Sequence, residues 1–386
     1  MKSSLRPLEL LLRHGIVYPL LRLVFRNSEV TTGIRLQTVR KLLILRYDRI
    51  GDIIVTTPVL RKLKHSHPDL RIGVLASKSN ADLVRTNPFV DRLHILPDHW
   101  WQWRAFLREA RREQYDVVLN FIFNRTTSGG VLANLIAPKG IKVGQGADKY
   151  RFYFNKLMHL ERGRDHMADV LLKYVGAVFD LPRRKGTTSF EIVVDEQAKH
   201  TVNSFLKDFK ITRRRFIVLN ISSTESVKQM SRKQADVLAQ FLATQCRETV
   251  VVISAPSDSR VRNEITTHPG KRLFPFPPQG DTDMLTIAEL IRESKAVITP
   301  DTSIIHVASA MGTPVMGLYT PLQVTNEWLP YGVMHRMVLA GNGEPVSSIK
   351  TETLEFETRA FLKSLKRTSD GRNRRPARTK KKTKRK

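Results

Sequence analysis

LLILRYDRIGDIIVTTPVLRKLKHSHP, residues 42–68, is the stretch that decides the fold class of this chain of 386 residues. It begins with Leu42–Leu45, an apolar run of the kind found in buried strands. A polar loop follows, and a helical pattern then extends from about Asp52 to His65. A buried strand that leads directly into a helix is typical of a parallel sheet with helices on both faces.

The same alternation of short apolar runs and amphipathic stretches continues along the chain. It extends from residue 41 to 143, becomes less regular over 145–210 and restarts at 216. We therefore expect two doubly wound α/β units in tandem, divided near 185–212. Leu181-Pro182 and the basic residues 183–185, at the start of this division, are typical of a linker. Ligands of such sheets bind at the carboxyl ends of the strands, and here also in a cleft between the two domains.

The pattern also predicts where the parts of the chain begin and end. We expect the Pro-rich residues 274–280 to form a loop and residues 351–365 to form the last amphipathic helix. The predicted parts are a basic amphipathic arm at 1–40, a first Rossmann-like domain at 41–190, a second at 212–365 and a disordered basic tail at 366–386.

The chain carries 65 Lys and Arg against 36 Asp and Glu, a formal net charge of +29. Such an excess implies an anionic partner, which is a nucleic acid, an acidic lipid or a phosphorylated substrate. The single cysteine, Cys246, excludes an internal disulfide framework and a cysteine-rich metal site. No stretch has the roughly 20 predominantly apolar residues of a spanning helix.

Both ends of the chain are basic. The tail at 366–386 holds twelve basic residues and one acid, which suits either a solubilising terminus or an electrostatic tether to anionic lipid. It lacks aromatic residues that stack on bases, so nucleic acid is the weaker alternative. Apolar residues recur at helical spacing between Leu8 and Phe25, with arginines among them. That segment fits either a membrane interface or packing onto the domain behind it.

The loop after the first predicted strand, residues 46–52, contains one glycine, Gly51. A dinucleotide-binding dehydrogenase has a G-x-G-x-x-G motif at this place, so that class is disfavoured. Asp52 follows at the start of the helix. Its carboxylate either caps the helix or acts as a general base.

A second polar block lies at 299–314, where a strand ends and a helix begins. Thr302 and Ser303 place hydroxyls and backbone N–H groups at a helix N-terminus, which suits a diphosphate. Asp301 repels phosphate, so we expect it to cap the helix or to bind a sugar hydroxyl. His306 lies one turn into the helix, on the same face.

A third polar loop, residues 220–228, ends in Lys228, which is placed to neutralise a phosphate at the same sheet edge. Asp281-Thr282-Asp283 has the spacing of a metal-binding D-x-D, but it precedes a predicted helix, and we interpret it as a cap. No motif for a metal site, a P-loop or a serine nucleophile is present in the sequence.

Together these blocks resemble the heptosyltransferases of glycosyltransferase family 9, which build the core of bacterial lipopolysaccharide. The resemblance is strongest at 42–68 and in VITPDTSIIHVASAMGTPVMGLYTP, residues 297–321. Residues 120–144 and 164–176 support it more weakly.

This resemblance implies a GT-B fold, in which two Rossmann-like domains face a central cleft. It implies inverting transfer of a heptose, or a related sugar, from an ADP-sugar to a lipopolysaccharide core or similar glycan acceptor, without metal or cofactor. By position, Asp52 is then the base and Lys228 lies beside the donor phosphates. The other donor-binding residues that it implies are Ser223, Thr224, Asp301, Thr302, Ser303 and His306.

The expected partners are a nucleotide sugar, an anionic glycolipid acceptor and an anionic membrane surface, and nucleic acid is not expected. The acceptor chemistry and the basic ends predict a cytoplasmic protein bound peripherally to the inner face of the cytoplasmic membrane. Two alternatives stay open. One is a GT-B-like sugar-nucleotide epimerase, and the other is a non-catalytic basic protein that binds nucleic acid.

Overall fold

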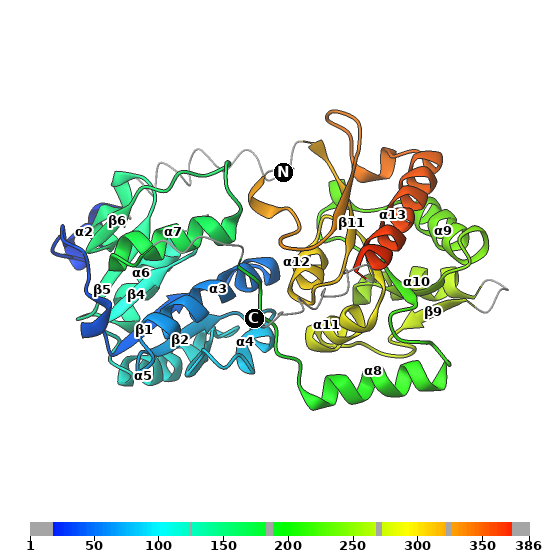
Figure 1. Ribbon diagram of the computed structural model, residues 1–386. Helices are drawn as coiled ribbons and strands as arrows, with labels where there is room; N and C mark the ends of the chain where they lie inside the picture. The colour runs from blue at the N-terminus through cyan, green and yellow to red at the C-terminus, as the bar shows by residue number, and fades with distance from the viewer. Residues whose placement is uncertain (1–17, 124–125, 183–187, 268–271, 322–325, 373–386) are drawn as a thin grey trace, which may run out of the picture.

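The computed structural model describes residues 18–123, 126–182, 188–267, 272–321 and 326–372, with side chains as far as Lys366. Figure 1 shows two α/β halves side by side, each built around a sheet. Both sheets have six strands, and every strand pair in them is parallel. The prediction of two successive units with parallel sheets is confirmed.

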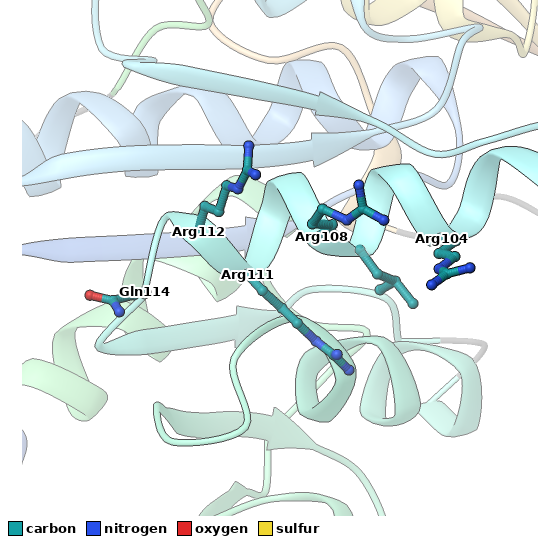
Figure 2. A pocket seen from close by; sticks show the side chains of 6 residues that line it. Arg104, Arg108, Arg111, Arg112 and Gln114 are labelled. Carbon is teal, nitrogen blue, oxygen red and sulfur yellow. The ribbon is translucent and has the colours of Figure 1, made fainter.

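The first sheet has the strand order β3-β2-β1-β4-β5-β6. Its strands are β1 (Lys41–Leu45), β2 (Arg71–Ala76), β3 (Arg92–Ile95), β4 (Val117–Asn120), β5 (Ile141–Gln145) and β6 (Lys156–Met158). One face packs against α3 (Ile50–Ser66), α4 (Asp82–Arg85) and α7 (Met167–Phe179). The other face packs against α5 (Trp103–Arg112) and α6 (Thr126–Ile136), and Figure 2 shows α5 from close by. Shorter elements of this half are α2 (Tyr18–Val24), η2 (Leu36–Thr38), η3 (Trp100–Gln102) and η4 (Asp148–Tyr153).

The second sheet has the order β12-β11-β10-β7-β8-β9. Its strands are β7 (Phe216–Asn220), β8 (Thr249–Ile253), β9 (Leu273–Phe276), β10 (Ala296–Pro300), β11 (Val315–Tyr319) and β12 (His335–Leu339). One face packs against α8 (Glu196–Asp208), α11 (Met284–Glu293) and α12 (Ser303–Ala310), and the other against α9 (Arg232–Gln240), α10 (Ser259–Thr266) and α13 (Thr351–Arg372). Short helical turns complete this half: η5 (Ser226–Lys228), η6 (Phe241–Gln245), η7 (Pro256–Asp258), η9 (Asn326–Trp328) and η10 (Val346–Ser348).

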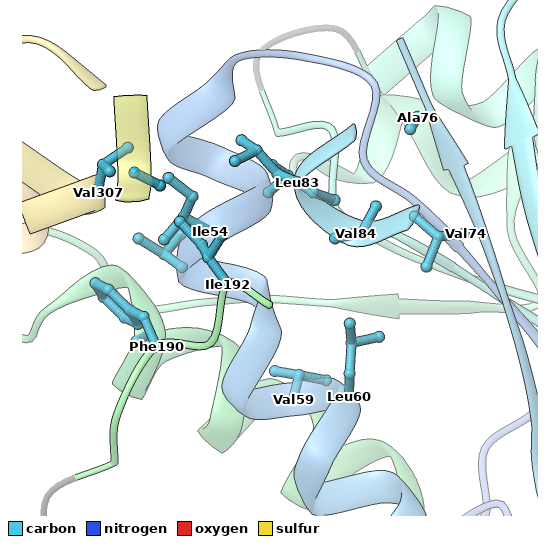
Figure 3. Close-up of a cluster of buried hydrophobic side chains, with 14 of the residues drawn as sticks. Ile54, Val59, Leu60, Val74, Ala76, Leu83, Val84, Phe190, Ile192 and Val307 are labelled. Atoms are coloured by element: carbon cyan, nitrogen blue, oxygen red, sulfur yellow. The ribbon is translucent and has the colours of Figure 1, made fainter. Parts of the chain in front are cut away.

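A single apolar core crosses from one half to the other. It joins the α3 face of the first sheet to the α12 face of the second, and Phe190 and Ile192 of the connecting segment belong to it. Figure 3 shows Ile54 of α3, Ile192 and Val307 of α12 grouped in this region. The burial of apolar surface, the main stabilising effect in folding, therefore also holds the two halves together.

Three details differ from the sequence-based expectations. Residues 273–276 form the edge strand β9, although we expected a loop from residue 274. Proline is tolerated there because an edge strand has neighbours on one side alone. The helix expected to end at residue 365 extends to Arg372, so residues 366–372 of the tail that we expected to be disordered are helical. The irregular stretch before residue 212 contains α8, which packs against α11. The predicted domain bounds themselves stay a prediction.

Several predicted segments lie outside the described residues. These are most of the basic tail (373–386), the first part of the N-terminal arm (1–17) and the basic part of the linker (183–187). Among the helices that the structure does describe, none combines the length and apolar character needed to cross a bilayer.

Candidate active site

Arg46, the first residue after β1, is the centre of the first loop. Its side chain is almost fully buried, and its guanidinium donates to the backbone oxygens of Asp52 and Phe121 and to the Thr56 hydroxyl. One terminal nitrogen lies 3.1 Å from Asp48 Oδ2, and the other lies 3.0 Å from Asp52 Oδ1. The rigid fork of a guanidinium suits this role, because it presents five donors in fixed directions.

Asp52 has two structural partners. It is the third residue of α3, and its Oδ2 accepts the Arg49 backbone N–H at 3.3 Å, one of the N–H groups at the helix start that have no partner within the helix. Its Oδ1 pairs with Arg46. The capping alternative for Asp52 is therefore confirmed, and the carboxylate still has lone pairs with which to accept a further proton.

Asp48 shares the same arginine and lies on the other side of it. Burial raises the pKa of Asp48 to about 6, against the effect of Arg46, and the nearby Asp52 carboxylate adds to the rise. Its Oδ1 is buried and has no hydrogen-bond partner among the described residues. Two carboxylates thus lie beside one guanidinium at the carboxyl end of β1.

Gly51 permits a close approach between α3 and α12. A Cβ at this position would lie 2.6 Å from His306 Cδ2, which is closer than real Cβ contacts. The His306 ring is buried, and the rings of Trp328 and Phe190 lie 5.8 and 6.5 Å away, centroid to centroid. Burial, together with the nearby His166 and Lys228, lowers the pKa of His306 to about 3, so this side chain is neutral at physiological pH.

The second sheet contributes a lysine and an aspartate. Lys228, at the end of η5, places Nζ 2.8 Å from Asp301 Oδ2, at the carboxyl end of β10. Burial raises the pKa of Asp301, and the bond from Lys228 opposes the rise. Asp301 therefore pairs with the lysine, whereas Thr302 is the residue that caps α12, accepting from the Ile304 N–H at 3.3 Å. The expectation that Asp301 caps the helix is wrong, and its alternative role of binding a sugar hydroxyl stays a prediction.

The two loops meet through one ion pair. Arg49 Nη1, next to the Asp52 end of α3, lies 3.1 Å from Glu225 Oε1 in the loop that leads to Lys228. Glu225 Oε1 also lies 3.7 Å from Lys228 Nζ. Arg49 and Glu225 are 176 positions apart in the sequence. The Asp52 loop and the Lys228 loop are therefore neighbours in space, although they are distant along the chain.

The remaining predicted residues lie on the same loops. Thr302 Oγ1 is 3.4 Å from the Asn220 amide nitrogen and 3.3 Å from the Thr299 hydroxyl. Ser303 is the first residue of α12, where backbone N–H groups have no partner within the helix. Ser223 donates its N–H to Gln229 and accepts from the Glu225 N–H, while Thr224 is exposed.

Sequence reasoning gave no role to Arg46, Asp48 or Glu225, although all three lie in the loops that it singled out. The sequence does hold a hint of Arg46 and Asp48, because the arginine comes directly after a predicted strand and two aspartates follow it within six residues. Asp283 accepts from the Thr286 N–H as the cap of α11, as predicted. No group of three or more metal-ligating side chains gathers within the described part of the chain.

The model of "Glycosyltransferase family 9 (heptosyltransferase)" matches residues 103–355. The lipopolysaccharide core heptosyltransferase OpsX of Haemophilus influenzae is 22% identical over 296 residues, which cover 72% of this chain and 79% of that protein.

Solved structures agree in fold. The glycosyl transferase family 9 protein of Veillonella parvula has a TM-score of 0.73 at 20% identity, covering 86% of this chain and 99% of that one. The E. coli heptosyltransferase WaaC with ADP has a TM-score of 0.66 at 15% identity, covering 84% and 99%. The predicted GT-B fold, with two Rossmann-like halves, is confirmed.

The comparisons favour neither the epimerase nor the nucleic-acid-binding alternative. The family model spans well over half of the chain and includes both loops of the second sheet that carry predicted donor-binding residues. This protein therefore belongs to glycosyltransferase family 9 and is a glycosyltransferase.

Proposed function

We propose that the protein transfers a heptose, or a related sugar, from an ADP-sugar to a lipopolysaccharide core or similar glycan, with inversion and without metal. The observation that carries this proposal is the meeting of the two loops through Arg49 and Glu225. It joins the loop after β1, which carries the Asp52 carboxylate, to the loop after β7, which carries Lys228. Lys228 in turn pairs with Asp301, next to the helix terminus at the carboxyl end of β10. Ligands of parallel sheets bind at these ends.

Each side has a separate chemical task. Asp52 takes the proton from the acceptor hydroxyl as the hydroxyl oxygen attacks the anomeric carbon. The bond from that carbon to the nucleotide diphosphate breaks, and the diphosphate leaves with the bonding electrons. Lys228 and the first N–H groups of α12, at Thr302 and Ser303, stabilise the leaving charge.

Lys228 is not free in this structure, because Asp301 already holds it. A bound diphosphate would compete with that carboxylate for the ammonium group. We propose that Asp301 then turns to a sugar hydroxyl, and that Ser223 and Thr224 contact the nucleotide. His306 contributes an uncharged wall and not a positive charge, since burial keeps its ring neutral.

The identity of the donor and acceptor is supported by relatives. WaaC of E. coli was solved with ADP, and OpsX is named as a lipopolysaccharide core heptosyltransferase. We propose the same classes of substrate here, and binding to the inner face of the cytoplasmic membrane, where a lipid-linked acceptor would be met. Loss of activity in EDTA and its recovery with magnesium would contradict the metal-independent mechanism.

Asp52→Asn tests the base directly. An asparagine oxygen still accepts the Arg49 N–H, but the side chain no longer takes a proton and no longer pairs with Arg46. General-base catalysis contributes typically 10²–10⁴-fold, so we expect turnover to fall by roughly that factor. ADP binding measured by calorimetry should change by no more than a few-fold.

Asp283→Asn is the matched control. Asp283 also caps a helix, α11, and is not part of the two loops that meet at Arg49 and Glu225. The turnover of the Asp283→Asn variant should equal that of wild type. Equal turnover of Asp52→Asn and Asp283→Asn would remove Asp52 from the mechanism.

A further inference from the structure

One surface of the first half combines exposed tryptophans with arginines that form no ion pair with the described residues. Trp100 and Trp101, in the η3 turn before α5, are 81% and 60% exposed. From α5, four arginines line a surface hollow of about 560 Å³, and Figure 2 shows them extending from successive turns of the helix. The arginines are Arg104, Arg108, Arg111 and Arg112.

The acid within α5, Glu109, and the one directly after it, Glu113, are engaged elsewhere. Glu109 pairs with Arg92, and Glu113 pairs with Lys41 at 3.1 Å, so both carboxylates face the neighbouring strands. Asp98, next to the tryptophans in sequence, pairs with Lys78. Across the described residues, none of the four arginines forms an ion pair, and the surface therefore carries a net positive charge.

The position of this surface relates it to the active site. β3, β2 and β1 are parallel, so the chain leaves β3 at the same sheet edge where the Asp52 loop leaves β1. β3 is two strands away from β1, which is about 10 Å. Trp100 and Trp101 thus lie on the edge of the sheet that carries the proposed base.

We propose that Trp100, Trp101 and the arginines of α5 form a docking surface for an anionic phospholipid bilayer. Tryptophan is enriched where a protein meets the headgroup region, since its ring is apolar and its N–H is polar. Arginines beside it bind lipid phosphates. The tryptophan end of this surface then holds the sheet edge with Asp52 beside the membrane from which a lipid-linked acceptor would come, while α5 runs back toward the opposite edge. The docking itself does not depend on which sugar is transferred.

Two features favour lipid over single-stranded nucleic acid as the occupant. Base stacking needs open ring faces, but His99 covers one face of Trp101, with ring centroids 4.3 Å apart and planes at 4°. In addition, α2 exposes three aliphatic side chains, Leu20, Leu23 and Val24. α2 packs against α6 through Tyr18 and Thr127, and α6 contacts α5, so these aliphatic groups belong to the same helical layer.

Vesicles whose acyl chains are brominated test the proposal in the full-length protein. Bromine quenches tryptophan emission only where the ring reaches the acyl region. We expect quenching of wild type on phosphatidylglycerol vesicles, and loss of most of that quenching in Trp100→Ala/Trp101→Ala. Phe356→Ala, which removes an exposed ring from α13, is the matched control and should be quenched like wild type.

The charge is tested separately by sedimentation with the same vesicles. Arg104→Gln/Arg108→Gln/Arg112→Gln should weaken partitioning by roughly fivefold per arginine, about 100-fold in all. The control variant removes three positive charges as well, but from exposed positions of the second half: Lys233→Gln/Lys350→Gln/Lys363→Gln. Its partitioning should stay within a few-fold of wild type.

Three results would overturn the proposal. One is wild-type protein that sediments with vesicles without being quenched, which would assign the binding to the basic ends alone. Another is an arginine triple variant that partitions like the lysine control. The third is a single-stranded oligonucleotide that binds through Trp100 and Trp101 while vesicles do not. Turnover on a delipidated, soluble acceptor should be unchanged in all these variants, so failure of docking and failure of the proposed transfer are distinguishable.

Discussion

At the scale of single residues, Arg46 explains why two aspartates coexist in one loop. Its guanidinium lies 3.1 Å from Asp48 and 3.0 Å from Asp52, so one buried positive charge serves two carboxylates. Asp52 also receives the Arg49 N–H, whereas Asp48 retains a buried oxygen with no partner in the described residues. The two carboxylates therefore differ in how well their charges are stabilised.

This difference predicts a pH dependence of stability that belongs to Asp48. Its pKa is raised to about 6 in the folded protein, so between about pH 4 and pH 6 the unfolded chain has lost this proton while the folded protein still holds it. The Asp48 carboxyl therefore lowers stability as the pH rises through this window. Asp48→Asn has no such proton, and its stability relative to wild type should increase by up to about 3 kcal/mol from about pH 4 to pH 7.

Urea unfolding of both proteins at the two pH values measures this change. Asp69→Asn, at an exposed position, is the control and should show no comparable shift. If Asp48→Asn and wild type differed in their free energy of unfolding by the same amount at both pH values, the raised pKa of Asp48 would be contradicted.

At the scale of elements, α3 and α12 pack closely against each other where Gly51 meets the His306 ring. Gly51 is needed there because the His306 ring occupies the space of a side chain. Gly51→Ala should destabilise the protein by roughly 1–3 kcal/mol, the usual effect of overpacking, and should lower turnover by displacing the Asp52 loop.

His306→Ala tests the origin of that effect. Removing the ring relieves the clash, so the double variant Gly51→Ala/His306→Ala should be more stable than the sum of the two single changes predicts. Gly33→Ala serves as the control, since a Cβ at this position meets its nearest neighbour at 3.9 Å. Strict additivity in thermal unfolding would show that the clash is not the cause.

At the scale of the whole molecule, polar contacts reinforce the apolar core between the halves. Arg162 donates two bonds to Glu327, at 3.1 and 2.7 Å, and the Gly163 N–H donates a third to the same carboxylate. The Tyr331 hydroxyl donates to Asp169, and the His166 ring lies 3.1 Å from the Leu329 carbonyl oxygen. These contacts join the region around α7 to the segment around η9.

Glu327 predicts how this interface responds to pH. Burial by itself would raise the pKa of Glu327, but the bonds from Arg162 and the Gly163 N–H outweigh it and lower the pKa. The stabilisation is therefore present above the pKa of the unfolded chain and is lost as the pH falls below about 4. Glu327→Gln should lower the free energy of unfolding by roughly 1–2 kcal/mol at neutral pH, and the difference should shrink in acid.

Thermal unfolding over a pH series measures this effect, with Glu352→Gln on the exposed side of α13 as control. If the loss of stability caused by Glu327→Gln became larger in acid, the ion pair between Arg162 and Glu327 would not be stabilising in the way proposed.

The sequence by itself determined the two parallel sheets, the helix starts at α3 and α12, and the loops that carry the site. These features follow from local patterns, since strands, caps and polar loops depend on neighbouring residues in the chain. The tertiary structure alone decided that Arg46 joins Asp48 to Asp52 and that Glu225 links the two loops. It also decided that Asp301 pairs with Lys228, so that Thr302 caps α12. It also decided that residues 273–276 become an edge strand and that His306 is neutral. Burial and ion pairing depend on groups that are distant in sequence, and no local pattern specifies which of them meet.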